Sequence, residues 1–150
     1  MADWEQIING VGVALGGDAE RGRQLLRECW DGTDEVDHPK RCVLAHYLAD
    51  LEDALDREVR WDESALASYR HVEPADLAMI GIPDAAGLAP SLHLNLGDGY
   101  LRQDRLDEAQ AQVAAGQLGV GALGSDGYGA MIRGGLEKLQ ERIAAARRVS

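Results

Sequence analysis

The chain has 150 residues, enough for one domain with a substantial core and too few for two domains of average size. Apolar residues make up 45% of it and charged residues 27%, a composition typical of soluble globular proteins that excludes a disordered chain. Twenty-six acidic against fifteen basic residues give a formal net charge of −11. The resulting field repels phosphate backbones, so a nucleic-acid partner is not expected.

The opening stretch, MADWEQIING, lacks the basic start and the long apolar core of a secretion signal. No later stretch approaches the roughly 20 apolar residues of a membrane span. We therefore expect a cytoplasmic protein with no membrane partner. Cys29 and Cys42 are too few for a disulfide framework, and both are expected to face the interior.

Helical spacing of apolar residues dominates the chain, and strand signals are weak because Phe is absent and apolar–polar alternation is short. The first two helices are predicted over 4–15 and 18–30, separated by GGD at 16–18. Because this turn is short, the two helices should form an antiparallel hairpin over about 3–31.

A second hairpin is predicted over about 39–71. Pro39 suits the first turn of its first helix. The apolar stripe of that helix is formed by Leu44, Leu48, Leu51 and Leu55. The second helix of the pair is expected from about Trp61 to His71, after a tight turn.

The stretch VEPADLAMIGIPDAAGLAP, residues 72–90, predicts a long connection because its prolines and glycines interrupt helical spacing. One short helix is expected near 75–79. A third hairpin follows over about 90–118, and a last helix is predicted over about 126–147, after a glycine-rich break. Its apolar side carries Met131, Ile132, Leu136, Leu139 and Ile143.

Three hairpins and a terminal helix are typical of a short solenoid. RWDES at 60–64 also aligns with RLDEA at 105–109, which favours internal repetition. The stretch SLHLNLGDGYLRQDRLDEAQAQVAAGQ, residues 91–117, resembles a tetratricopeptide repeat, in which a Leu-Gly pair, a Tyr three positions later and residues of fixed size let two helices pack closely. The matching residues are Leu96, Gly97, Tyr100, Ala109 and Val113. Looser units begin near Asp3 and Ala45.

Glycine inside a helix costs about 1 kcal/mol relative to alanine, so Gly10 and Gly97 need a packing reason. We expect both to lie where paired helices come close together.

The resemblance implies an all-α fold: a short right-handed stack of antiparallel helical hairpins with a C-terminal capping helix. It also implies a non-catalytic module that binds a protein or peptide on an inner wall lined mainly by the first helix of each pair. The wall positions are His46, Asp53, Asp56 and Arg57 in the middle unit and Leu94, Asn95, Asp98, Leu101 and Arg102 in the third. Asn95 matches a position that often hydrogen-bonds a peptide backbone in this family.

The acids and two arginines of this wall favour a polar or basic partner, and no lysine pair is present to hold a terminal carboxylate. That these side chains are merely solvated charges is an equal alternative. A homodimer through Trp4 or the last helix is a further possibility, because a short stack has exposed ends.

DHPKRCVLAH places His38, Cys42 and His46 four residues apart on one side of a helix, with Cys29 on the preceding helix. Two thiols and two imidazoles suit tetrahedral zinc, so a small helical metal-binding sensor or enzyme is the alternative function. However, the two histidines are about 12 Å apart along the axis, too far to share one ion unless the first turn unwinds. We therefore assign no metal, no cofactor and no catalytic residue.

Two further motifs are weaker. GVGALG at 119–124 has the G-x-G-x-x-G spacing of a dinucleotide site, but it follows a helix instead of a strand and is interpreted as a flexible joint. Ser91, His93 and Asp98 are close in sequence, but residues two apart on a helix point in different directions. An enzyme with a pocket under residues 72–90 would have only scattered carboxylates to use.

Overall fold

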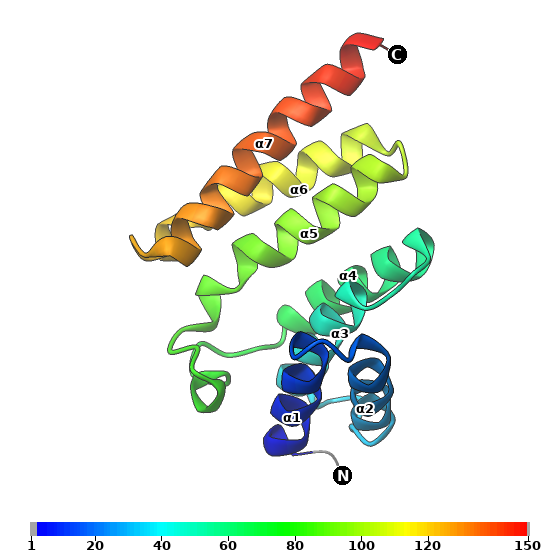
Figure 1. Ribbon diagram of the computed structural model, residues 1–150. Coiled ribbons are helices and arrows are strands. Elements are labelled where there is room, and N and C mark those ends of the chain that lie inside the picture. The colour runs from blue at the N-terminus through cyan, green and yellow to red at the C-terminus, as the bar shows by residue number, and fades with distance from the viewer. Residues whose placement is uncertain (1–2, 150) are drawn as a thin grey trace. The chain divides into compact units, whose positions relative to one another are not determined.

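A computed structural model describes residues 3–149, and within that range every regular element is a helix (Figure 1). The predicted all-α class is therefore confirmed. The chain forms two compact units, the first ending at Asp84 and the second beginning at Ala85. Both units contain helical hairpins, with short 3₁₀ helices in the connections.

The first unit consists of two hairpins. Its helices are α1 (Trp4–Leu15) and α2 (Ala19–Asp31), then α3 (His38–Asp50) and α4 (Leu55–Tyr69). The members of each pair lie side by side, and α2 also packs against α3, which joins the two hairpins (Figure 1). A short 3₁₀ helix, η1 (Ala78–Ile80), follows and packs against α1.

Polar caps begin α1 and α2. Asp3 Oδ1 accepts a hydrogen bond from the Gln6 backbone N–H at 2.9 Å, and the Gln6 side chain accepts one from the Asp3 N–H at 3.0 Å. Asp18 caps α2 by accepting from the Arg21 N–H at 3.0 Å. Between the helices, Gly17 has φ 110°, which favours glycine and allows the sharp turn.

Two glycines let α1 and α2 approach closely. A Cβ on Gly22 would lie 2.5 Å from the Ala14 Cβ and 2.7 Å from its backbone nitrogen. A Cβ on Gly10 would lie 2.8 Å from Leu26 Cδ2. The packing reason expected for Gly10 is therefore confirmed.

The turn between α3 and α4 lies earlier than predicted. The α3 helix ends at Asp50, and α4 begins at Leu55 instead of near Trp61. The backbone N–H groups of Leu51 and Glu52 each bond a carbonyl three residues back, at 3.1 and 3.2 Å, which tightens the chain into a turn. The leucine stripe expected on one helix is therefore broken up: Leu44 and Leu48 lie on α3, but Leu51 lies in the turn and Leu55 begins α4. No glycine or proline marks this turn. Because the apolar spacing continues through it, the sequence predicts a longer helix than the one that forms.

The second unit is a hairpin covered by a longer helix. The hairpin is formed by α5 (Ala89–Arg102) and α6 (Leu106–Leu118), and α7 (Gly127–Val149) packs against both (Figure 1). Two short 3₁₀ helices, η2 (Ala85–Gly87) and η3 (Val120–Ala122), contact each other. In addition, η2 contacts α5 and η3 contacts α6. The predicted third hairpin and terminal helix are therefore present.

Gly97 shows how tightly these three helices pack. A Cβ on Gly97 in α5 would lie 3.2 Å from the Gln112 Cβ in α6 and 2.9 Å from Leu139 Cδ2 in α7. The close contact expected at Gly97 is confirmed, and it involves the terminal helix as well as the paired one. No helix within residues 3–149 combines the length and the apolar character needed to cross a lipid bilayer.

The connection over 72–90 holds less helix than predicted. Turns and η1 occupy the place of the short helix expected near 75–79. Gly81 follows η1 with φ 86°, a conformation that ends a right-handed helix, and Pro83 lies two residues further on.

The similarity between RWDES and RLDEA does not mark equivalent positions. Residues 60–64 lie in the middle of α4, whereas 105–109 include the last turn residue and the first turn of α6. The turns inside these two hairpins are residues 51–54 and 103–105. Both stretches belong to hairpins, but the letters they share fall at different points along them.

Candidate functional site

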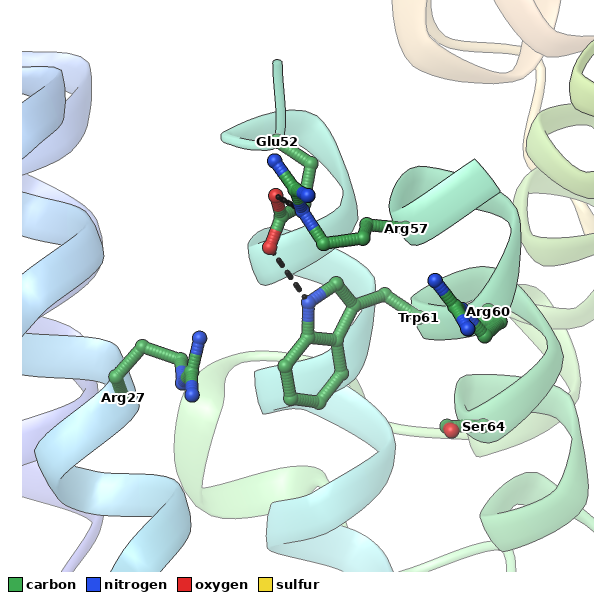
Figure 2. A pocket seen from close by; sticks show the side chains of 6 residues that line it. All are labelled: Arg27, Glu52, Arg57, Arg60, Trp61 and Ser64. Carbon is green, nitrogen blue, oxygen red and sulfur yellow. Dashed lines mark hydrogen bonds and ion pairs between the residues drawn. The ribbon is translucent and has the colours of Figure 1, made fainter. Parts of the chain in front are cut away.

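A pocket of about 290 Å³ opens on the first unit between α2 and α4 (Figure 2). Its lining residues are Arg27 from α2, Glu52 from the turn after α3, and Arg57, Arg60, Trp61 and Ser64 from α4. The four α4 residues are spaced i, i+3, i+4 and i+7, so they share one face of that helix.

The indole of Trp61 is held by contacts with three neighbours. Its Nε1–H donates a hydrogen bond to Glu52 Oε1 at 3.0 Å, drawn as a dashed line in Figure 2. The ring of Trp30 on α2 meets the Trp61 ring edge to face, with centroids 4.9 Å apart and planes at 83°. The Arg27 guanidinium lies over the same ring, 5.8 Å from its centroid. The Trp61 side chain is therefore ordered before any ligand arrives.

Glu52 is the one carboxylate that lines the pocket within the described part of the chain, and both its oxygens are in use. Oε1 accepts from Trp61, and Oε2 accepts from Arg57 Nε at 3.1 Å. Its side chain is only 3% exposed. Burial raises the pKa of Glu52, but the hydrogen bonds from Trp61 and Arg57 and the charges of Arg57 and Arg23 outweigh burial and hold the pKa below its ordinary value. Glu52 is thus an ionised structural group.

Arg27 and Arg60 form no ion pair with any residue in the range 3–149, and both are exposed. Arg57 is paired with Glu52. Among the lining residues, three guanidinium groups therefore face one carboxylate. The pocket is locally positive on a protein whose net charge is −11.

Further contacts fix Trp30 against Trp61. The Arg41 guanidinium of α3 lies 4.5 Å from the Trp30 ring centroid. Arg41 Nε donates to Thr33 Oγ1 at 3.0 Å, and Thr33 Oγ1 donates to the Trp30 carbonyl at 2.7 Å. These contacts tie the end of α2 to α3, so the pocket wall is part of the packing of the first unit.

One predicted wall residue of the first unit, Arg57, lines this pocket. His46 lies on α3, but Asp53 lies in the following turn, and Asp56 and Arg57 lie in the first turn of α4. The expectation that all of them share the first helix of a hairpin is wrong, because α3 ends before Asp53. Asp53 pairs with Arg23 of α2 at 3.9 Å. His46 is largely buried, and burial lowers its pKa.

The predicted wall residues of the second unit all lie on α5, the first helix of its hairpin, as expected. They are Leu94, Asn95, Asp98, Leu101 and Arg102. Part of this face is engaged by α7. Gly135 of α7 packs directly against Leu94, because a Cβ on Gly135 would lie only 2.7 Å from Leu94 Cδ2. Asp98 accepts hydrogen bonds from Arg142 of α7 at 2.7 Å and from Arg102 at 2.9 Å.

The cysteines and histidines are not brought together as one site. Across the described residues, 3–149, no group of three or more His, Cys, Asp or Glu side chains is placed to hold a metal ion. Cys29 and Cys42 are buried free thiols, which confirms that both face the interior. Burial raises the pKa of Cys42 to about 12. The His38 ring stacks on His71, with centroids 4.4 Å apart.

Ser91 and His93 have separate structural partners. Ser91 Oγ donates a hydrogen bond to the Leu88 carbonyl at 3.4 Å, and His93 Nδ1 lies 2.7 Å from Gln112 Oε1. These separate partners agree with the expectation that Ser91 and His93 point in different directions.

The glycine-rich stretch 119–124 joins α6 to α7 and contains η3. Its carbonyl groups are bound by the side chain of Arg133 in α7. The acceptors are the carbonyls of Val120, Leu123 and Gly124, at 3.2, 3.1 and 2.9 Å. Arg133 thus fixes this joint at the beginning of α7.

Among the residues that line the pocket, Arg57 is the one that also belongs to the wall positions predicted from the sequence. A signal for the other lining residues of α4 was present in the i, i+3, i+4, i+7 spacing of residues 57, 60, 61 and 64. It was hidden because the helix was predicted to begin only near Trp61. Arg27 and Glu52 come from other elements, and no local pattern joins them to this face.

No family model, no curated protein and no solved structure matches this chain. The resemblance to tetratricopeptide repeats therefore stays a prediction.

Proposed function

We propose that this chain is a non-catalytic module that binds another protein through the pocket between α2 and α4, where a peptide segment or helix of the partner would lie against Trp61. The observation that carries the proposal is the preorganised state of Trp61. Glu52, Trp30 and Arg27 all contact its indole, and its exposed surface opens into the pocket.

Two physical arguments support a binding role. Tryptophan and arginine are the residue types most enriched among the side chains that dominate the energy of protein interfaces, and this pocket combines one tryptophan with three arginines. Association is also opposed by the entropy of ordering side chains, and Trp61 is already ordered. Recognition at this surface therefore requires little rearrangement.

The inner wall suggested by the repeat resemblance is a less favoured binding surface. On α5, Leu94 and Asp98 are engaged by α7. Arg57 belongs to both surfaces, and its pairing with Glu52 makes it part of the pocket wall. The cytoplasmic location and the absence of catalysis remain parts of this proposal. A homodimer through Trp4 or α7 is a separate prediction, which sedimentation at high protein concentration tests.

The test is a selection from a random peptide library against the immobilised full-length protein. A parallel selection uses Ser64→Trp, which fills the pocket and leaves Trp61 and its neighbours in place. Peptides that share a motif and are enriched only by the unmodified protein are the expected result. Identical peptides from both proteins, or none above an unrelated control protein, would show that this pocket is not a binding surface. Circular dichroism verifies that the variant is folded.

A further inference from the structure

The electrostatics of the pocket point to the chemistry of its ligand. Glu52 is 3% exposed, and its oxygens accept hydrogen bonds from Trp61 and Arg57. Its charge is thus offset by Arg57 and hidden from a ligand. Arg27 and Arg60 remain as exposed charges with no ion pair within residues 3–149. An approaching group meets the surplus of positive charge on these two arginines.

The side chains that line the pocket place positive charge on both sides of an aromatic ring. Figure 2 shows the Trp61 indole with Arg27 on one side and Arg60 on the other, and Ser64 one turn further along α4. An indole face accommodates an alkyl stem, and a guanidinium group binds a carboxylate through two parallel N–H groups. The Ser64 hydroxyl adds a further donor. An aspartate or glutamate side chain has both parts, a carboxylate for one of the two arginines and a short stem for the indole.

The charge of the whole protein excludes polyanions more strongly than single anions. With a net charge of −11, the protein repels a nucleic acid, whose many phosphates interact with the whole surface. A peptide carboxylate needs only the local field, since charges beyond about 8 Å are screened at physiological ionic strength. We therefore expect this surface to bind a short acidic peptide segment in preference to a nucleic acid.

We propose that the pocket recognises an acidic segment of a partner protein, in which the carboxylate of an Asp or Glu residue binds Arg27 or Arg60 while the stem of that residue packs on Trp61. This inference rests on the proposed function and specifies its ligand. It differs from the polar or basic partner expected from the sequence, because the pocket is lined by arginines and not by the acids of the predicted wall.

The test uses arrays of degenerate peptides, each pool carrying one fixed residue at its centre and mixed residues around it. The fixed residues are Glu, Asp, Gln, Lys and phosphoserine, and the full-length protein is labelled for detection. We expect the Glu and Asp pools to retain roughly tenfold more protein than the Gln or Lys pools. This preference should weaken as the ionic strength rises, because the contacts are charge-assisted and partly exposed.

A matched pair of double variants separates the pocket from general charge effects. Arg27→Ala with Arg60→Ala removes both unpaired pocket charges. Arg21→Ala with Arg70→Ala removes the same charge from exposed positions on α2 and at the end of α4, outside the pocket. The first variant should lose the preference for Glu and Asp pools, and the second should keep it.

The remaining outcomes are equally decisive. Equal retention of all pools, loss of the preference in both double variants, or stronger retention of the phosphoserine pool than of the Glu pool would each overturn the assignment of a carboxylate. A preference for the Gln or Lys pool that Ser64→Trp abolishes would overturn this inference and leave the proposed binding function standing. Retention of no pool, together with a failed library selection, would remove both.

Discussion

The rings of Trp30 and Trp61 meet edge to face with centroids 4.9 Å apart, which joins α2 to α4 at the pocket wall. Such aromatic pairs contribute about 1 kcal/mol beyond the area they bury. We expect a double-mutant cycle of Trp30→Leu and Trp61→Leu to show a coupling of about 1 kcal/mol in the free energy of unfolding. Urea denaturation followed by circular dichroism measures it. Strictly additive effects would mean that the ring contact itself adds nothing.

Glu52 should make the protein sensitive to acid. Its pKa in the folded protein is below the ordinary glutamate value of 4.5. The stabilisation is therefore complete above pH 4.5 and is lost as the pH falls toward the lower folded pKa, because the unfolded chain takes up the proton first. Glu52→Gln should lower the free energy of unfolding at neutral pH by about 1 kcal/mol and flatten this acid dependence.

Asp53→Asn is the control for Glu52→Gln, because it removes one negative charge from the adjacent residue, whose side chain is 92% exposed. It should change stability by less than about 0.5 kcal/mol at neutral pH. Denaturation curves recorded between acid and neutral pH compare the two variants. The same pH profile in Glu52→Gln and in the unmodified protein would contradict the assigned role of Glu52.

Gly22 and Gly12 should respond in opposite directions to the same substitution. A Cβ at Gly22 would lie 2.7 Å from the backbone nitrogen of Ala14, whereas a Cβ at Gly12 meets no atom within 4 Å. Gly22→Ala should therefore destabilise the protein by about 1–3 kcal/mol through overpacking. Gly12→Ala should stabilise it by up to about 1 kcal/mol, because alanine is the better helix former. Thermal unfolding measures both, and a neutral Gly22→Ala would mean that the two helices can separate freely.

Cys42 should be unreactive in the native protein. Its side chain is fully buried, and burial raises the pKa of its thiol to about 12, so almost no thiolate forms at neutral pH. We expect an aromatic disulfide reagent to label Cys42 only as fast as the protein unfolds. A peptide with an accessible thiol, treated in denaturant as the control, should react at once. Mass spectrometry after digestion follows Cys42 separately from Cys29. Rapid labelling of native Cys42 would show that α3 opens locally.

The helical class, the hairpin at 3–31, the hairpin that precedes the terminal helix, and the close contacts at Gly10 and Gly97 could all be predicted from the amino-acid sequence. These features depend on short-range chemistry: apolar spacing of three and four residues, and glycines that allow close packing. Such signals act within one or two turns of the chain, so a single sequence is enough to recognise them.

The beginning of α4 and the composition of the pocket could not be predicted in this way and became known from the folded structure. The backbone turn after Asp50 has no glycine or proline to announce it, yet it moves Arg57, Arg60 and Trp61 onto one helical face. Arg27 and Glu52 join that face from other elements. A pocket built by side chains from three segments depends on distances between helices, and the spacing of residues along one chain does not contain those distances.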